Sequence, residues 1–265
     1  MSRKILKDLL PPLVLRNITG LFYGWNGNYC DWETARKKCS GYDSEMILEK
    51  VKQSALNVKD GLAAYERDSV VFMEHEYNFP VLTIVMLIAA QNNGKVRLLD
   101  LGGSLGSTYF QNRLFLDSLP EMKWCIVEQP GFVEAGKKYF QDDRLKFHYS
   151  IDECLENTDI DIVLLSSVLP YLEKPYELLG SLFRSRFKYL VIDKMPLVNG
   201  SDRITIQRVN PGIYKASYPC WFFNRGKFLD FMKQEYDLIA EFDNTDSSNI
   251  KSEFKGFLFR IKDNV

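Results

Sequence analysis

The sequence predicts an α/β fold built on a mostly parallel sheet with helices on both faces. From about residue 96 onward, short apolar runs typical of strands alternate with segments of helical periodicity, and such alternation favours parallel strands joined by helices. The length of 265 residues and the 46% share of hydrophobic residues are enough for one large domain with its own core. The alternation ends in two strand-like runs, 236–242 and 256–261, with only a polar segment between them.

Five strands and four helices are expected before that final pair. The strands are expected at 96–101, 124–128, 145–149, 160–166 and 189–193. The helices are expected at 107–118, 131–140, 151–156 and 175–183. Ser150 and Glu153 match a capping box at the start of the third helix, which gives both residues a structural role.

Two regions lie outside this alternation. Residues 1–91 are expected to form an N-terminal helical cap, with Asp31 and Asp43 as N-caps. Residues 92–265 are expected to form the main domain. Within it, the insert 197–222 is predicted to contain a short strand in RITIQRV, a turn at Asn-Pro-Gly and an aromatic segment, IYKASYPCWFF.

The charge balance and the scarcity of histidine exclude several kinds of site. Lys and Arg total 34 against 35 Asp and Glu, so the net charge of -1 offers no general attraction for nucleic acid. His75 and His148 are the only histidines, too few for a His-rich metal cluster. The five cysteines are widely spread without a C-x-x-C pair. Neither a disulfide framework nor a metal site is therefore predicted, and reduced thiols in a cytoplasmic protein explain them.

The N-terminus is basic, but it is not expected to be a signal peptide. Arg3, Lys4 and Lys7 precede an apolar stretch that Asp8 and two prolines interrupt, and no small-residue cleavage site follows. The apolar run that begins at residue 80 is half the length a bilayer needs, so no membrane span is predicted. A peripheral contact of residues 1–16 with a membrane surface stays open, and the oligomeric state does not follow from the sequence.

A glycine-rich turn carries the strongest functional signal. In VRLLDLGGSLGSTYF an apolar strand ends at Asp100, and the turn at 102–106 leads directly into a helix. Glycine permits a tight turn and the close approach of a ligand, while a helix N-terminus presents free N–H groups. Doubly wound sheets bind nucleotide cofactors at this edge. Glu128 ends the next strand, 22 residues after Gly106, where a carboxylate can hold the two hydroxyls of a ribose.

Three ligands or reactions compete for such a turn. NAD needs G-x-G-x-x-G, and this turn has serine where the second and third glycines should stand. S-adenosylmethionine lacks a pyrophosphate and needs an acidic residue before the glycines, which Asp100 supplies. The pattern G-x-S-x-G centred on Ser104 also matches the nucleophile elbow of serine hydrolases. That reaction needs a later histidine, and the only one, His148, lies within a predicted strand.

Seven stretches spread over nearly the whole chain match a known pattern. They are GYDSEMI, YERDSVVF, LDLGGSLGSTYFQNR, WCIVEQ, LLSSVLPYL, IDKMP and IYKASYPCWFF. In these stretches the chain resembles the class I S-adenosylmethionine-dependent methyltransferases. It is most similar to a group of them encoded in bacterial surface-polysaccharide gene clusters for O-antigen lipopolysaccharide and capsule. The resemblance implies a Rossmann-like sheet of seven mostly parallel strands that ends in an antiparallel hairpin, with S-adenosyl-L-methionine as cofactor.

The resemblance also implies a cofactor site at the strand ends. The glycine-rich turn would line the methionine end, Glu128 would hold the ribose, and residues further along would lie near the adenine. The expected cofactor-binding residues are Asp100, Gly102, Gly103, Ser104, Gly106, Glu128, Gln129, Asp152 and Ser166. The sequence departs from the class pattern D-x-G-x-G at Ser104. It departs from the group at Pro170 and at Lys194–Met195, where Gln and Arg-Thr are usual, and these positions concern the acceptor.

Candidates for catalysis and acceptor binding follow from residue chemistry. Asp193, at a strand end, and His75 are candidate bases, and Arg67 can hold a phosphate or carboxylate bidentately. Each has a plainer alternative: Asp193 forms an ordinary turn, His75 is a surface histidine, and Arg67 belongs to a solvated run of charges. The expected acceptor-binding residues are Arg67, Tyr109, Arg113, Lys194, Arg203, Tyr218 and Trp221. Helix surface explains Tyr109 and Arg113 equally well, and packing between cap and insert explains the aromatic residues.

The leading hypothesis is a methyltransferase acting on an oxygen of a small-molecule acceptor: a sugar, a sugar phosphate, a phosphoramidate or a nucleotide-linked precursor of a surface polysaccharide. With a hydroxyl acceptor a base removes the proton. With an anionic acceptor no base is needed, and Arg67, Arg113 or Arg203 positions it. The second hypothesis is a cofactor-binding partner protein without transfer activity, and the third is a serine hydrolase that uses Ser104.

Overall fold

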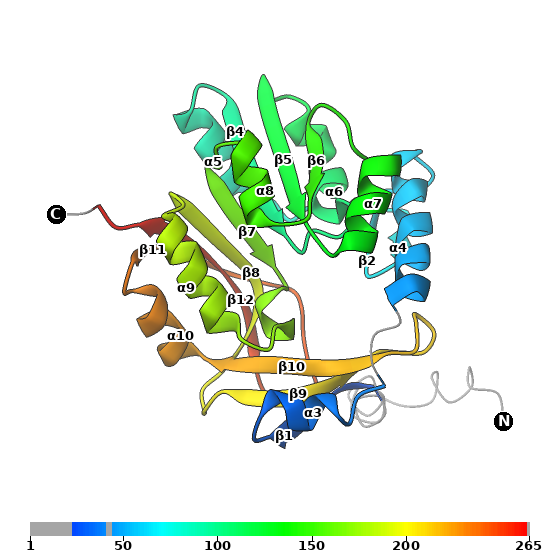
Figure 1. The fold of residues 1–265 in the computed structure, drawn as a ribbon, viewed down its shortest axis with the longest axis vertical. Helices are drawn as coiled ribbons and strands as arrows, with labels where there is room; N and C mark the ends of the chain where they lie inside the picture. Colours follow the sequence, from blue (N-terminus) through cyan, green and yellow to red (C-terminus); the bar gives the residue numbers. More distant parts are fainter. Residues whose placement is uncertain (1–22, 41–43, 264–265) are drawn as a thin grey trace.

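One mixed sheet of ten strands forms the centre of the molecule (Figure 1). A computed structural model describes residues 23–40 and 44–263 of the chain. The middle of the sheet consists of parallel neighbours in the order β6, β5, β4, β7, β8. Their bounds are β4 (Lys95–Leu101), β5 (Glu121–Val127), β6 (Leu145–His148), β7 (Ile162–Ser166) and β8 (Tyr189–Val198). The predicted α/β class with a mostly parallel sheet is confirmed.

The last two strands form the antiparallel hairpin that the resemblance implies. β11 (Tyr236–Asp243) pairs antiparallel with β12 (Glu253–Ile261), and β12 lies antiparallel to β8. With the parallel strands they make up the seven strands that the sequence predicts. The largest difference in bounds concerns β8, which continues past its predicted end at Asp193 as far as Val198.

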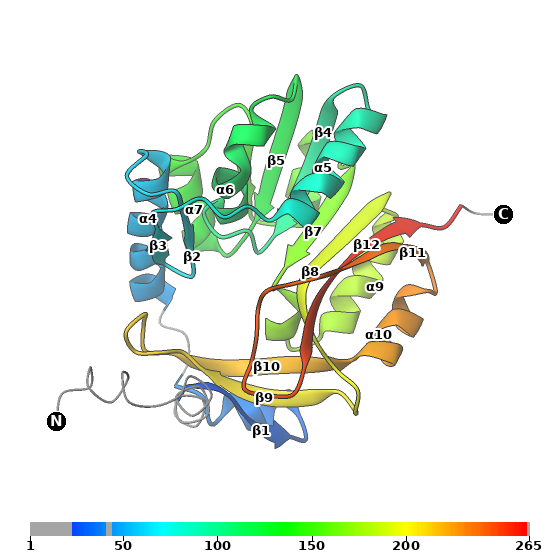
Figure 2. The ribbon, with the colours of Figure 1, turned by 180° about the vertical axis from the view of Figure 1, so that it is seen from behind.

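Three further strands extend the sheet beyond β8. β10 (Ser217–Asn224) pairs parallel with the end of β8 through Phe223 and Asn224 only. β9 (Arg203–Arg208) lies antiparallel to β10, and β1 (Gly24–Tyr29) lies antiparallel to β9. Figure 2 shows this extension crossing below the rest of the sheet. The strand predicted in RITIQRV is confirmed as β9, and the aromatic segment that follows it is itself a strand.

The region before residue 92 is less helical than the sequence predicts. Its described part contains α3 (Trp32–Arg36), α4 (Ser44–Lys59) and α5 (Phe79–Gln91), but also β1, β2 (Tyr65–Arg67) and β3 (Val70–Phe72). Asp31 caps α3 as predicted, because its Oδ1 accepts a hydrogen bond from the backbone N–H of Thr34 at 2.7 Å. Asp43 and residues 1–16 lie outside the described residues. The expectation of helix was wrong for β1, which takes its structure from pairing with β9.

Helices cover both faces of the sheet and enclose two cores. α4, α5, α6 (Ser107–Leu116) and α7 (Pro130–Tyr139) share one core with the parallel strands. α8 (Ile151–Asn157), α9 (Pro175–Ser185) and α10 (Arg225–Met232) share the other. Ser150 caps α8 as predicted, with its Oγ 3.0 Å from the backbone N of Glu153. Of the described helices, none combines the length and the apolar character that crossing a bilayer requires.

Candidate functional site

The glycine-rich turn joins the end of β4 to the start of α6. Three of its residues, Gly102, Ser104 and Gly106, have positive φ angles of 72°, 56° and 95°, a region that favours glycine. A side chain at Gly103 is also excluded, because a Cβ there would lie 2.5 Å from the Cγ of Asp100. The glycines therefore allow the backbone to fold tightly over Asp100 before the helix begins.

Asp100 lies beneath this turn. Its side chain is 1% exposed, and its Oδ2 accepts a hydrogen bond from the indole Nε1 of Trp124 at 3.0 Å. Burial raises the pKa of Asp100 from 3.8 to about 7, and the charge of Glu128 adds to the rise. Because the backbone of Gly103 lies against its carboxyl, Asp100 supports the glycine-rich turn from below.

Glu128 follows β5 at the same edge of the sheet. Its carboxylate accepts hydrogen bonds from the backbone N–H of Gln129, at 2.7 Å, and from the backbone N–H of Ser104. Burial raises the pKa of this half-buried group. A carboxylate has about four acceptor positions, so two remain for other donors. Gln129 is exposed at the start of α7, and Asp152 is exposed in the first turn of α8, after the neighbouring strand β6.

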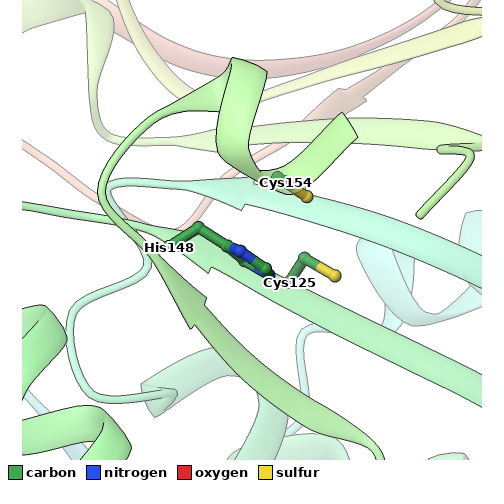
Figure 3. A group of neighbouring side chains, drawn as sticks. All are labelled: Cys125, His148 and Cys154. Atoms are coloured by element: carbon green, nitrogen blue, oxygen red, sulfur yellow. The ribbon is translucent and has the colours of Figure 1, made fainter. Parts of the chain in front are cut away.

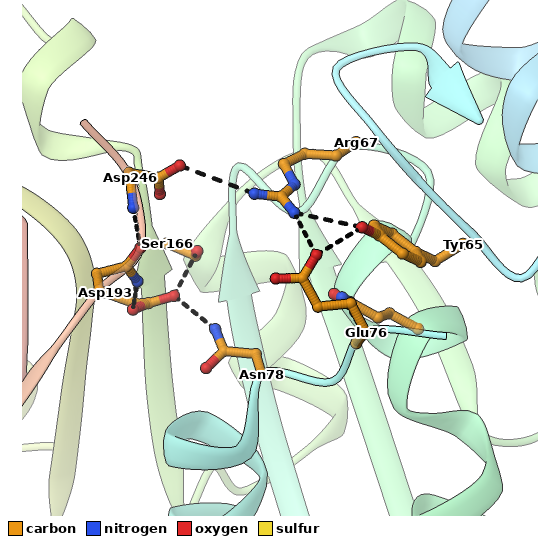
Figure 4. Close-up of polar contacts among 9 residues, drawn as sticks. Tyr65, Arg67, Glu76, Asn78, Ser166, Asp193 and Asp246 are labelled. Carbon is orange, nitrogen blue, oxygen red and sulfur yellow. Dashed lines mark hydrogen bonds and ion pairs between the residues drawn. The ribbon is translucent and has the colours of Figure 1, made fainter. Parts of the chain in front are cut away.

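Asp193 is the centre of a buried polar network (Figure 4). It lies opposite Ser166 in the register of β7 and β8. Its Oδ2 accepts hydrogen bonds from Asn78 Nδ2 at 2.8 Å and Ser166 Oγ at 3.1 Å, and its Oδ1 accepts one from Asn244 Nδ2 at 3.0 Å. The residue is 1% exposed, and burial raises its pKa.

This network joins three separate parts of the chain. Asn78 is also the N-cap of α5, Ser166 ends β7, and Asn244 begins the segment between β11 and β12. Sequence reasoning missed Asn78 and Asn244, because both lie outside the motifs. With three donors on its carboxylate, Asp193 is better placed to hold these elements together than to accept a substrate proton.

Arg67 stands beside that network on β2. Its guanidinium lies 5.9 Å from the centre of the Tyr65 ring and 5.8 Å from that of the Phe72 ring. It pairs with Glu76 at 3.3 Å and with Asp246 at 3.7 Å (Figure 4). Arg67 is thus pre-oriented by two aromatic faces, and both of its ion pairs are partly exposed to solvent.

Glu66, the residue before Arg67, connects the β2–β3 hairpin to the glycine-rich turn. It is 4% exposed and accepts hydrogen bonds from the hydroxyl of Ser107, at the start of α6, and from the backbone N–H of Ser69 at 3.2 Å. Burial raises its pKa. A carboxylate at the first turn of a helix also interacts favourably with the helix dipole. The hairpin is therefore held against the N-terminus of α6.

Strained backbone gathers at this edge of the sheet. Among the described non-glycine residues with positive φ, five belong to it: Asp68, Ser69, Ser104, Ser167 and Lys194. Such conformations cost about 1–3 kcal/mol each and occur preferentially at functional sites. The strain supports the edge formed by the ends of β4, β5, β7 and β8 as the site.

Carboxylates outnumber cations among the described residues of this edge. Burial raises the pKa of five of them: Glu66, Asp68, Asp100, Glu128 and Asp193. Arg67 and Lys194 are the nearby cations, and their charges oppose the rise at Asp68. Raised carboxyl pKa values are typical of sites that bind or transform ligands. This charge pattern fits a ligand that carries positive charge and hydroxyl groups.

Several predicted acceptor residues lie elsewhere. Tyr109 is wrong as an acceptor contact, because it is 1% exposed and packs edge-on against Trp124 in the core. Burial raises its pKa to about 12. Arg113 and His75 line a separate hollow of about 420 Å³ beside α6, and no residue of the glycine-rich turn lines it. Arg113 and His75 therefore lie near each other, but not beside the glycine-rich turn.

The predicted residues of the insert make structural contacts. Arg203 donates from Nε and Nη2 to the carbonyl oxygen of Gly27, at 2.9 and 2.7 Å, and so holds β1. Trp221 stacks on Trp32 and donates to the carbonyl of Leu172 at 2.9 Å.

Tyr218 contacts the segment that follows β7. Its ring meets that of Tyr171 edge-on, with centres 5.3 Å apart, in the short 3-10 helix Leu169–Tyr171 that follows β7. Of the two predicted aromatic acceptor residues of the insert, Tyr218 is thus in contact with the segment after β7, whereas Trp221 also stacks on Trp32.

No family model and no curated protein matches the sequence. Several solved structures are similar. The N-terminal domain of EvdMO1, crystallised with SAH and D-fucose, has a TM-score of 0.45 at 14% identity over 83% of this chain and 98% of that chain. The 1,6-didemethyltoxoflavin-N1-methyltransferase of Burkholderia thailandensis has a TM-score of 0.45 at 11% identity over 84% and 92%. An S-adenosylmethionine-dependent methyltransferase of Clostridium acetobutylicum has 0.44 at 10% over 68% and 89%. The function of this chain therefore rests on its own residues.

Proposed function

We propose that this protein is an S-adenosylmethionine-dependent methyltransferase that methylates an oxygen of a sugar-containing precursor of a bacterial surface polysaccharide. The observation that carries the proposal is the glycine-rich turn between β4 and α6, together with Glu128, whose carboxylate is fixed by the backbone N–H of Ser104. This pairing of a tight turn with an acidic residue at the next strand end suits a ligand that contains a ribose.

The residues present fit S-adenosylmethionine. Glu128 has acceptor positions left for the two ribose hydroxyls, and Gln129 and Asp152 stand exposed on the side where the adenine would lie. The turn would receive the methionine end, above the buried carboxyl of Asp100. When bound, the cofactor supplies a methyl group on a positively charged sulfur, and the carboxylates of this edge favour that charge.

The same charge pattern narrows the acceptor. An anionic acceptor such as a phosphate or phosphoramidate would approach an edge rich in carboxylates, and Arg67 is already paired with Glu76 and Asp246. A neutral sugar hydroxyl meets no such repulsion and can hydrogen-bond to these carboxylates. We therefore favour a hydroxyl acceptor, placed between Arg67, Lys194 and Tyr218.

Alignment is the main contribution expected from the protein. Correct positioning of two reacting groups lowers an activation barrier by up to about 7–11 kcal/mol. Here the acceptor oxygen would be held in line with the methyl group. Asp193, whose pKa burial raises, holds the start of α5, β7 and the 244–252 segment together through its three hydrogen bonds. Asp193 and His75 are the two candidate bases. Asp193 is buried in its hydrogen-bond network, whereas His75 lines the separate hollow beside α6. Asp193 is the stronger of the two, because it adjoins the site edge.

Calorimetric titration with S-adenosylmethionine tests the cofactor assignment. Two charge-assisted hydrogen bonds are worth about 1.5–3 kcal/mol each, so Glu128→Gln is expected to weaken binding at least about tenfold. Glu134→Gln, exposed on α7 nearby, is the matched control and should leave the affinity unchanged. No binding by the wild type, or equal binding by both variants, would overturn the assignment.

Transfer is tested with acceptors in matched pairs. Sugars and their phosphate esters are incubated with the protein and cofactor, and the release of S-adenosylhomocysteine is measured. We expect the neutral sugar of a pair to be the better acceptor. A consistent preference for the phosphate ester would refute the hydroxyl assignment, and cofactor binding without any transfer would favour the partner protein.

A further inference from the structure

A buried group of two thiols and one imidazole lies on the opposite face of the sheet from the glycine-rich turn. Cys125 is on β5, His148 ends β6, and Cys154 is on α8 (Figure 3). Their ligand atoms all lie within 4.8 Å of one another, and all three residues are buried. The described residues contain no other such group of three or more His, Cys, Asp or Glu side chains.

His148 has a nitrogen with no protein partner. The residue is 9% exposed, and its Nε2 is buried without a hydrogen bond. Its other nitrogen, Nδ1, lies 4.0 Å from the Oε1 of Glu153. An unsatisfied buried nitrogen is costly, about 1–3 kcal/mol, so such an atom calls for an explanation, and a bound ion shared with the neighbouring Cys125 thiol is one. A carboxylate on one imidazole nitrogen and a metal on the other is a frequent arrangement at metal sites.

The spacing is compatible with an ion. Zinc–sulfur bonds of about 2.3 Å in tetrahedral geometry hold two sulfurs about 3.8 Å apart. Donor atoms that lie within 4.8 Å reach this separation by moving about 1 Å, which small side-chain rotations provide. Thiolate and imidazole are soft or borderline ligands that select Zn²⁺ and Cu⁺ over oxygen-seeking ions such as Mg²⁺ and Ca²⁺.

We propose that Cys125, His148 and Cys154 form a binding site for one thiophilic d¹⁰ metal ion, Zn²⁺ or Cu⁺, with Glu153 as the carboxylate near the second nitrogen of His148. Three protein ligands suit three-coordinate Cu⁺ directly and leave one position for water on Zn²⁺. The prediction that the chain has no metal site is thereby revised. Sequence reasoning found no metal signal because Cys125 meets the other two ligands only through the pairing of β5 with β6 and the packing of α8 beside them.

The position of the site suggests what the ion does. Cys125 lies on β5, three residues before Glu128, which directly follows that strand. The carbonyl oxygen of His148 accepts a hydrogen bond from the backbone N–H of Glu128 at 3.3 Å. An ion here would connect β5, β6 and α8 directly below the strand ends. Its role is structural, and the proposal does not depend on the identity of the cofactor.

Metal content of the purified full-length chain tests the proposal. The protein is stripped with a chelator under reducing conditions, loaded with Zn²⁺ or, without oxygen, with Cu⁺, desalted and analysed for metal. About one retained ion per chain is expected, and the ion that survives competition by a graded chelator identifies the preferred one. The proposal is overturned if the protein retains neither ion. It is also overturned if the native chain carries a Cys125–Cys154 disulfide in place of bound metal.

Matched variants assign the ligands. Cys154→Ser and His148→Gln are expected to lose at least about nine-tenths of the bound ion, whereas Cys220→Ser, at a buried thiol elsewhere, should retain it. Glu153→Gln keeps an oxygen for the N–H of Tyr149 and should weaken affinity about tenfold to a hundredfold at unchanged stoichiometry.

Loading with Co²⁺ provides a readout that loss of fold does not mimic. Its near-ultraviolet band reports thiolate ligands, so Cys154→Ser should lower that band while circular dichroism stays native. Equal uptake of Zn²⁺ or Cu⁺ by wild type and the Cys154 variant, or a Co²⁺ spectrum without a thiolate band, would refute the site.

Discussion

Asp100 makes the stability of the folded protein depend on pH in a way that one substitution removes. Its carboxyl is 1% exposed and accepts a hydrogen bond from the indole of Trp124. Burial raises its pKa from 3.8 to about 7. In Asp100→Asn an oxygen remains for Trp124 while the titration disappears, so the variant isolates the effect of the charge.

The magnitude follows from the shift. In the unfolded chain the carboxyl ionises near its ordinary pKa of 3.8, whereas in the folded protein it stays protonated up to about pH 7. Between these values the folded state binds more protons than the unfolded state, so the free energy of unfolding falls as the pH rises. A shift of about three pKa units corresponds to about 4 kcal/mol, present at low pH and lost above about pH 7.

Urea unfolding, followed by tryptophan fluorescence at a series of pH values, measures this contribution. Between about pH 4.5 and pH 8 the variant is expected to gain about 3 kcal/mol relative to the wild type. Contributions from Glu66 and Asp193 cancel in that difference, whereas the charge of Glu128, which adds to the rise at Asp100, is part of the measured effect. Asp230→Asn, at a side chain that is 78% exposed, serves as control and should follow the wild type. If the difference in unfolding free energy between variant and wild type did not change with pH, Asp100 would have the same pKa in the folded and the unfolded chain. That result would refute the reasoning.

Three further substitutions have defined outcomes. Gly103→Ala places a Cβ 2.5 Å from the Cγ of Asp100 and should cost about 1–3 kcal/mol, measured by thermal unfolding; an unchanged melting temperature would contradict the tight turn. Arg203→Ala removes both hydrogen bonds to the Gly27 carbonyl, so amide hydrogen exchange should accelerate in β1 while the parallel strands stay protected. Ser150→Ala removes the cap of α8 and should lower the free energy of unfolding by about 1 kcal/mol in urea.

The parallel strands and their helices could be predicted because their structure is encoded locally. β4 and β7 are buried apolar runs, and each is followed by turn residues and a helix, so no distant partner is needed to recognise them. β1 gives no such signal. Its sequence, GWNGNY, contains two glycines and alternates weakly, and it is a strand because Gly24 to Tyr29 pair with β9 near the other end of the chain.

The candidate site likewise has a part that could be predicted from local sequence and a part that depends on tertiary packing. Residues 100–106 and Glu128 follow consecutive strands of one edge, so their proximity follows from the fold class alone. The donors to Asp193 come from the cap of α5 and the β11–β12 segment, whose positions depend on tertiary packing. Tyr109 was misplaced because it and Arg113, about 40° apart around α6, lie on either side of the boundary of the buried face.

The pairing of β1 with β9 has a consequence for the order in which the protein is made. Gly24 lies opposite Arg208, so the first strand leaves the ribosome about 180 residues before its partner. At about 5–20 residues per second, this interval is on the order of ten to forty seconds. For that time the aromatic residues of β1 lack their neighbour, while β4 to β7 already have theirs. Among the described strands, β1 is thus the one that waits longest for its partner, and a chaperone has that interval in which to bind it.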